Sequence, residues 1–257
     1  MIRFLLGFIA SFYFIWGMDA QQPFSALTSY PKSNQQILLD ETLNFARGHQ
    51  EFRDLYFQQN EADFIRLIKE GQNPKILFIG CSDSRVVPEL ILNARPGDIF
   101  VIRLAGNFVA PYLAQSIDGV AATLQYALEV LNIPHIIVCG HSHCGAVKGL
   151  FQDLDPKLGV LQRWLKLGEE AKQITLQIAK LSTPKEDLYV TAEEINVLVQ
   201  LEHLMTFPFV RSRVNEGKLG LHGWYFDIET GKIWYYNTQQ NRFLPLMEKY
   251  EEAVKMR

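Results

Sequence analysis

Two stretches of similar design decide the fold: ILFIGCSDSR at residues 76–85 and IIVCGHSHCG at residues 136–145. In each, an apolar run of the kind that forms a buried strand leads into a segment of polar and sulfur-containing residues. The carboxyl ends of parallel strands meet at one edge of an open sheet, and the loops that leave there can share a crevice. We therefore expect an α/β fold, with a mainly parallel β-sheet core flanked by helices and both polar segments at that edge.

The two segments contain three candidate metal ligands, Cys81, His141 and Cys144. Thiolate and imidazole together suit zinc, and three protein ligands leave a tetrahedral ion one position for water or substrate, as in catalytic sites. If a helix begins near Gly145, its first turn would let His141 and Cys144 face one ion. His143 is a competing ligand. It is directly adjacent to Cys144, however, and the side chains of adjacent residues usually point apart, which favours His141. One zinc ion per chain is the predicted cofactor.

Asp83 and Arg85 complete this candidate site. Alternate residues of an extended segment point the same way. A guanidinium can hold a carboxylate through two parallel hydrogen bonds that keep the acid ionised. Asp83 could then accept a proton from zinc-bound water. If Arg85 released the Asp83 carboxylate, that carboxylate could bind the metal and occupy its open position, which would give a closed, inactive form.

The paired motifs resemble the two signatures of the β-class carbonic anhydrases: Cys81-x-Asp83-x-Arg85 and, about sixty residues later, His141-x-x-Cys144-Gly145. The similarity extends from about residue 72 to about residue 237. It implies that the three candidate ligands bind zinc and that Asp83 and Arg85 form the catalytic dyad. It also implies a homodimer or dimer of dimers with active-site clefts at the subunit interface, and three residues that line each cleft: Gln72, Phe100 and Tyr126.

This resemblance implies reversible hydration of carbon dioxide to bicarbonate and a proton, by attack of zinc-bound hydroxide on the substrate carbon. An alternative on the same fold and motifs is hydrolysis of carbonyl sulfide or carbon disulfide. A binding module with a structural zinc is disfavoured because closed zinc sites normally have four protein ligands. A thiol redox protein is disfavoured because the sequence has no Cys-x-x-Cys motif.

The composition, with 48% hydrophobic and 21% charged residues, is that of an ordinary globular protein with one sizeable core. The net charge of −3 shows no basic excess, so nothing recommends nucleic acid as a partner. The expected partners are carbon dioxide and bicarbonate. Cys139, inside an apolar strand, is interpreted as a small buried hydrophobic residue. A disulfide between Cys81 and Cys144 in an oxidising compartment would abolish the metal site.

The amino-terminal segment differs from the rest of the chain. Arg3 precedes a thirteen-residue, largely apolar segment, 4–16, and polarity returns at Asp19, as in a secretory signal peptide. Thirteen residues are fewer than the roughly 20 that span a bilayer. We expect residues 1–20 to be a cleaved signal peptide and residues 21–34 an extended arm. Residues 35–257 would form a single catalytic domain, exported to the bacterial periplasm with no stable membrane span; an uncleaved membrane anchor is the alternative.

The remaining sequence predicts further elements, and two of its polar residues keep open interpretations. Arg103, at the end of a strand, is either a solvated edge residue or paired inside the cleft. His222 is either a packed edge residue or a proton relay. The predicted elements are two helices within 34–70 broken near Gly48 or Asn60, a strand at 99–103, helices at 116–131, 157–182 and 191–216 (the last with a capping box at Thr191 and a kink or split at Pro208), a terminal antiparallel hairpin at 219–236 and a short helix at 245–256.

Overall fold

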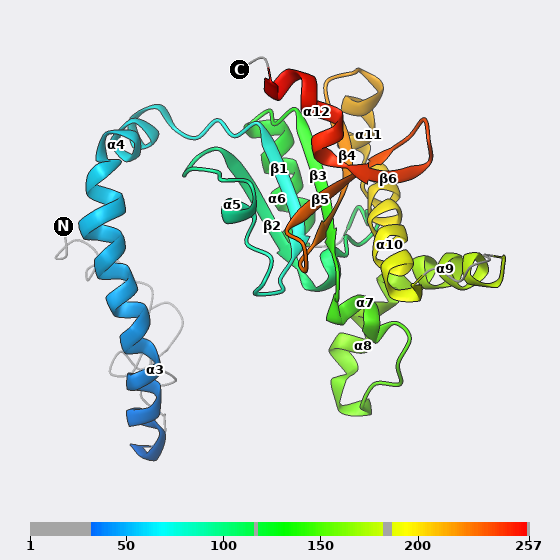
Figure 1. Ribbon diagram of the computed structural model, residues 1–257, viewed down its shortest axis with the longest axis horizontal. Coiled ribbons are helices and arrows are strands. Elements are labelled where there is room, and N and C mark those ends of the chain that lie inside the picture. The colour runs from blue at the N-terminus through cyan, green and yellow to red at the C-terminus, as the bar shows by residue number, and fades with distance from the viewer. Residues whose placement is uncertain (1–31, 116–117, 182–186, 256–257) are drawn as a thin grey trace. The chain divides into compact units, whose positions relative to one another are not determined.

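The computed structural model describes residues 32–115, 118–181 and 187–255 (Figure 1). The chain divides into two compact units, one ending at Ile65 and the other beginning at Arg66. The predicted signal peptide and residues 21–31 of the predicted arm lie outside the described residues, whereas residues 32–34 are helical rather than extended. Within the described ranges, no helix is both long and apolar enough to cross a membrane.

The described part of the first unit, residues 32–65, is mainly helical. Helix α3 (Lys32–Glu51) continues without interruption into a π-helical turn (Phe52–Phe57), and α4 (Glu61–Glu70) begins after Asn60 and extends past the unit boundary. The predicted break therefore lies at Asn60, and Gly48 is inside a helix. Aromatic rings of Phe52, Tyr56, Phe57 and Phe64 form a cluster with centroids 4.9 to 6.5 Å apart.

The second unit is organised around one six-stranded sheet in the order β2-β1-β3-β4-β5-β6. Strands β2, β1, β3 and β4 are parallel, and β4, β5 and β6 pair antiparallel (Figure 1). The predicted parallel core and terminal hairpin are confirmed, while β6 is an addition. The strand bounds are β1 (Ile76–Cys81), β2 (Ile99–Leu104), β3 (His135–His141), β4 (Gly220–Asp227), β5 (Lys232–Asn237) and β6 (Arg242–Pro245).

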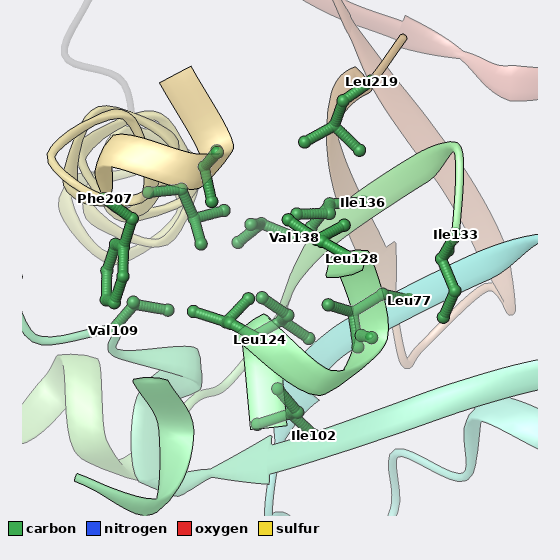
Figure 2. Packing of buried hydrophobic residues seen from close by; sticks show 14 of the residues in the cluster. Leu77, Ile102, Val109, Leu124, Leu128, Ile133, Ile136, Val138, Phe207 and Leu219 are labelled. Atoms are coloured by element: carbon green, nitrogen blue, oxygen red, sulfur yellow. The ribbon is translucent and has the colours of Figure 1, made fainter. Parts of the chain in front are cut away.

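The main core lies on one face of this sheet. Side chains alternate between faces along a strand, so Leu77 of β1 joins Ile136 and Val138 of β3 in one buried cluster. Figure 2 shows these residues packed with Leu124 and Leu128, which come from helical segments, and with Phe207, which lies between α10 and α11. The opposite face carries a second cluster that includes Phe78, Ile137 and Cys139. Because both faces of β1 and β3 are buried, the two strands read as continuous apolar runs.

The helices of the second unit differ from the predicted ones at their ends and breaks. Helix α10 begins at Leu188, not near Thr191, because the Asp187 carboxylate caps it by accepting from the backbone N–H of Tyr189 at 2.8 Å. Pro208 splits the predicted helix, as expected. The bounds are α5 (Pro88–Ile91), α6 (Gly119–Gln125) with a π-helical turn (Tyr126–Val130), α7 (Gly145–Gly149), α8 (Gly159–Leu165), α9 (Glu169–Leu181), α10 (Leu188–Met205), α11 (Pro208–Asn215) and α12 (Leu246–Lys255), with 3-10 turns at Ala105–Asn107, Pro156–Leu158 and Lys166–Gly168.

Candidate metal centre

The three predicted metal ligands come together at the carboxyl edge of the parallel strands. Cys81 is the last residue of β1, His141 is the last residue of the neighbouring β3, and Cys144 directly precedes α7. All three are buried, and their ligand atoms lie within 4.8 Å of one another. His143 is not part of this group: its backbone has a positive φ of 58°, and its Nε2 lies 2.8 Å from Glu229 Oε1. The geometry therefore agrees with the choice of His141 over His143.

The imidazole of His141 is arranged to bind a cation. Its Nδ1 lies 2.9 Å from the carbonyl oxygen of Ser142, which can only accept, so the proton is on Nδ1. Its Nε2 is buried and has no hydrogen-bond partner among the described residues. A buried polar atom without a partner is uncommon in a folded protein. An unpaired imidazole lone pair beside two thiols is the donor set that zinc prefers.

The two thiols of the centre have pKa values shifted in opposite directions. A hydrogen bond with Cys144 lowers the pKa of Cys81 to about 4, and the same bond raises the pKa of Cys144. The backbone N–H groups of Asp83 and Gly106 also donate to the Cys81 sulfur, at 3.4 and 3.3 Å. One thiolate is therefore favoured by the protein itself, and a bound cation would favour the second.

Asp83 and Arg85 form the predicted pair. Arg85 Nε donates to Asp83 Oδ1 at 2.9 Å, and Arg85 Nη2 donates to Oδ2 at 2.7 Å. These hydrogen bonds are the main reason that the pKa of Asp83 lies well below its usual range. Arg85 Nη2 also donates to the carbonyl oxygen of His143 at 3.0 Å, which connects the two loops of the centre. The carboxylate is held by Arg85 and does not belong to the group of candidate ligands.

Arg103 is exposed on the edge strand β2, yet its guanidinium binds backbone carbonyls of the candidate centre. From the neighbouring strand β2, its Nε donates to the carbonyl oxygen of Cys81 at 3.0 Å, and its Nη2 donates to that of Asp83 at 2.6 Å. Two backbone carbonyls on either side of Ser82 are thus bound by one guanidinium. Arg103 therefore fixes the segment that carries both a candidate ligand and the dyad carboxylate.

Buried polar residues of α10 support the centre, and the sequence analysis did not identify them. Glu193, only 2% exposed, accepts from the backbone N–H of Cys144 at 2.8 Å and from the Tyr225 hydroxyl at 3.0 Å. Asn196 donates to the Gly106 carbonyl at 3.0 Å and accepts from Gln200 at 2.9 Å. Since the N–H of Gly106 donates to Cys81, this one helix supports both thiol ligands. The spacing of positions 193, 196 and 200 along one helix face is the signal that could have revealed them.

The three predicted cleft residues do not line the metal centre of their own chain. Phe100 of β2 lies beside Leu77, whereas Cys81 lies beside Leu104. Phe100 is thus about 13 Å away from Cys81 along the strand direction. The Tyr126 ring lies 6.1 Å from that of Phe100, centroid to centroid. Gln72 precedes β1 and is exposed, at the end of the strand opposite Cys81.

The two remaining sequence interpretations concern Cys139 and His222. Burial raises the pKa of the Cys139 thiol to about 12, which agrees with a small hydrophobic role. All three cysteines are free. His222 lies beside Ile137, four positions before Phe226, which is the partner of His141. It is therefore remote from the metal centre, and its location does not favour a proton relay.

Comparison with known proteins agrees with the two motifs. A family model described as carbonic anhydrase matches residues 76–233. A carbonic anhydrase from Synechocystis sp. is 45% identical over 192 residues, which cover 74% of this chain and 69% of the relative. A carbonic anhydrase from Pseudomonas aeruginosa is 40% identical over 202 residues, covering 77% of this chain and 89% of the relative.

Solved structures show the same relationship. The β-carbonic anhydrase CcaA superposes with a TM-score of 0.75 at 42% identity, covering 80% of this chain and 92% of that one. One of two tetrameric β-carbonic anhydrases from Sordaria macrospora superposes with a TM-score of 0.67 at 33% identity, covering 76% and 96%. The chain therefore belongs to the β-class carbonic anhydrases, enzymes whose general reaction is the hydration of carbon dioxide.

Proposed function

We propose that this chain hydrates carbon dioxide reversibly to bicarbonate with one zinc ion held by Cys81, His141 and Cys144. The observation that carries the proposal is a group of one imidazole and two free thiols whose ligand atoms lie within 4.8 Å of one another. The buried Nε2 of this His141 imidazole has no hydrogen-bond partner among the described residues. Zinc bound by three protein ligands acts as a Lewis acid and lowers the pKa of a water molecule to about 7.

The dyad would orient the attacking water. Asp83 is kept ionised by two hydrogen bonds from Arg85, so its carboxylate can accept a further hydrogen bond from water. Accepting that bond directs a lone pair of the water oxygen toward the carbon of the substrate. Arg85 binds the Asp83 carboxylate and the carbonyl oxygen of His143, and Arg103 binds the backbone carbonyl of Asp83. These contacts keep the accepting carboxylate in place.

We infer that Gln72, Phe100 and Tyr126 line the substrate cleft of a second copy of the chain. The pair of Phe100 and Tyr126 offers an apolar surface that suits uncharged carbon dioxide, but it lies far from the metal centre of its own chain. A homodimer or dimer of dimers would bring that surface to a neighbouring centre. The tetrameric Sordaria macrospora enzymes support an assembly of this kind.

We also propose export. The largely apolar segment 4–16 behind Arg3 supports a signal peptide at residues 1–20, followed by an arm and a catalytic domain over residues 35–257. Expression of the full-length chain in a bacterium, followed by amino-terminal sequencing of the periplasmic fraction, tests this proposal. A new amino terminus near Gln21 is expected. Recovery of the intact chain in the membrane fraction would instead indicate an uncleaved anchor.

The experiment that tests the reaction is stopped-flow carbon dioxide hydration together with the zinc content of the purified chain. Cys144→Ser should lose zinc and lower the rate by several orders of magnitude, because it removes a ligand. Cys139→Ser is the matched control. It should keep its zinc content and its hydration rate, since the Cys139 thiol does not belong to the group of candidate ligands. One bound zinc without any hydration would contradict the proposal. Hydrolysis of carbonyl sulfide is not favoured, because the relatives described above are all named as carbonic anhydrases.

A further inference from the structure

Two histidines meet on the sheet at the end opposite the metal centre. His135 is the first residue of β3, whereas His141 is the last, so the two ends are about 20 Å apart. In the register of β3 with β4, His135 lies beside Gly220 and Ile137 beside His222. His135 and His222 are therefore diagonal neighbours on the same face of the sheet.

The two imidazole rings already have the separation that one metal ion requires. His222 Nε2 lies 3.2 Å from His135 Nδ1. Two nitrogens that are each about 2.1 Å from one ion, at angles of about 90° to 109°, are about 3.0 to 3.4 Å apart. The strands hold both residues, so little rearrangement would be needed for both nitrogens to face an ion.

The two rings pack closely against Gly220, which has no side chain to obstruct them. A Cβ atom at Gly220 would lie 2.9 Å from His135 Nδ1 and 3.0 Å from His222 Nε2. A cavity of about 260 Å³ adjoins the pair and is also lined by Tyr236 and Thr238. Strand β5 pairs with β4 only from Trp224 onward, so among the described residues no strand pairs with the first half of β4 on that side. The pair can thus be reached by an ion and by the water molecules that would complete its coordination.

The charges around His222 favour its neutral form. Its pKa is lowered mainly by burial, and also by electrostatic interactions with His135 and with the Lys249 ammonium. Neutral imidazole is the form that binds metals. The Lys249 ammonium lies over the rings of Tyr235 and Tyr250, 4.9 and 5.4 Å from their centroids. Its charge makes this a weaker cation site than the thiol-containing centre.

We propose that His135 and His222 form a second site, for a divalent transition-metal ion such as Ni²⁺ or Zn²⁺, with water as the remaining ligands. The ion links the amino ends of β3 and β4, which are joined in the chain only through a long connection. Binding to the folded state alone stabilises it by mass action. The site is independent of the reaction proposed above.

The test is calorimetric titration of Ni²⁺ into the full-length, zinc-loaded protein, whose first centre is already filled. The wild type should bind one further Ni²⁺ per chain, and Ni²⁺ should raise its Tm. His135→Gln and His222→Gln should each weaken Ni²⁺ binding by at least about tenfold, because loss of a group that merely supports a ligand already costs 10- to 100-fold. Gly220→Ala should weaken Ni²⁺ binding although both histidines are present, since the new methyl would lie against both ring nitrogens and displace them.

His49→Gln is the control, because His49 is also an exposed histidine but lies on α3. Its Ni²⁺ affinity should equal that of the wild type. Each glutamine variant should also keep its carbon dioxide hydration rate and its circular dichroism spectrum, which separates loss of the site from loss of the fold. Absence of saturable Ni²⁺ binding, or binding unchanged in both glutamine variants, would show that the imidazoles only share a hydrogen bond.

Discussion

Glu193 is a buried carboxylate whose two oxygens each accept one hydrogen bond, from the Cys144 backbone and from the Tyr225 hydroxyl. A glutamine at this position has one acceptor and one donor group, so one of the two donors would face another donor. Glu193→Gln should therefore loosen the loop that carries Cys144. We expect about 10- to 100-fold weaker zinc binding with a largely intact fold, measured by competition with a chromophoric chelator.

Glu202→Gln provides the comparison for this substitution, because Glu202 lies on the same helix and is exposed. It should leave zinc affinity unchanged. Equal zinc affinity in the Glu193→Gln variant and the wild type would show that Glu193 contributes to packing alone.

At the level of secondary structure, the close contact between α10 and β3 depends on Gly140. A Cβ atom there would lie 2.7 Å from Val197 Cγ2 and 3.2 Å from the Glu193 carbonyl oxygen, both on α10. Gly140→Ala should move the helix away from the sheet and lower the free energy of unfolding by about 1 to 3 kcal/mol. Urea unfolding measures this loss.

Val197→Ala tests whether the contact is the cause. In the double variant Gly140→Ala/Val197→Ala, the smaller side chain should relieve part of the clash, so the double variant should lose less stability than the two single losses added together. Strict additivity would mean that the strain arises elsewhere, for example at the Glu193 carbonyl.

The elements that carry the motifs were predictable, because the apolar runs of β1 and β3 are buried on both faces and each ends at a polar loop. The start of α10 was not, because Asp187 and Thr191 are both good capping residues and only the fold selects between them. The short strand β6 was missed because Arg242–Pro245 has too few residues for a period. The buried polar groups of α10 share one helix face, which the sequence does show, but their hydrogen-bond partners follow only from the loops that the fold places beside them.

At the level of the whole molecule, the remote position of Phe100 leads to a test by complementation. Phe100→Ala should lower kcat/KM by about tenfold, as expected for loss of one apolar contact with a small substrate. Cys144→Ser should be inactive. If Phe100 serves the neighbouring centre, a mixed dimer of the two variants contains one centre with an intact ligand set and an intact Phe100. Co-expression should therefore give more activity per zinc-loaded chain than Phe100→Ala alone.

Two outcomes of that mixing experiment are distinguishable. A gain in kcat/KM per zinc-loaded chain in purified mixed dimers supports a cleft shared between copies. Activity per zinc-loaded chain equal to that of the Phe100→Ala protein would place the contribution of Phe100 within its own chain. Differently tagged chains, purified in two steps, ensure that only mixed dimers are assayed.

The separation of the ligands along the chain has a kinetic consequence. Cys81 and Cys144 lie on segments about sixty residues apart that become neighbours only when β1 and β3 pair. Closing so long a loop is entropically costly before the sheet forms, so a nascent chain presents only part of the ligand set at any one place. Metal binding is then a late step of folding: the ion binds after most of the sheet has formed and stabilises the folded state.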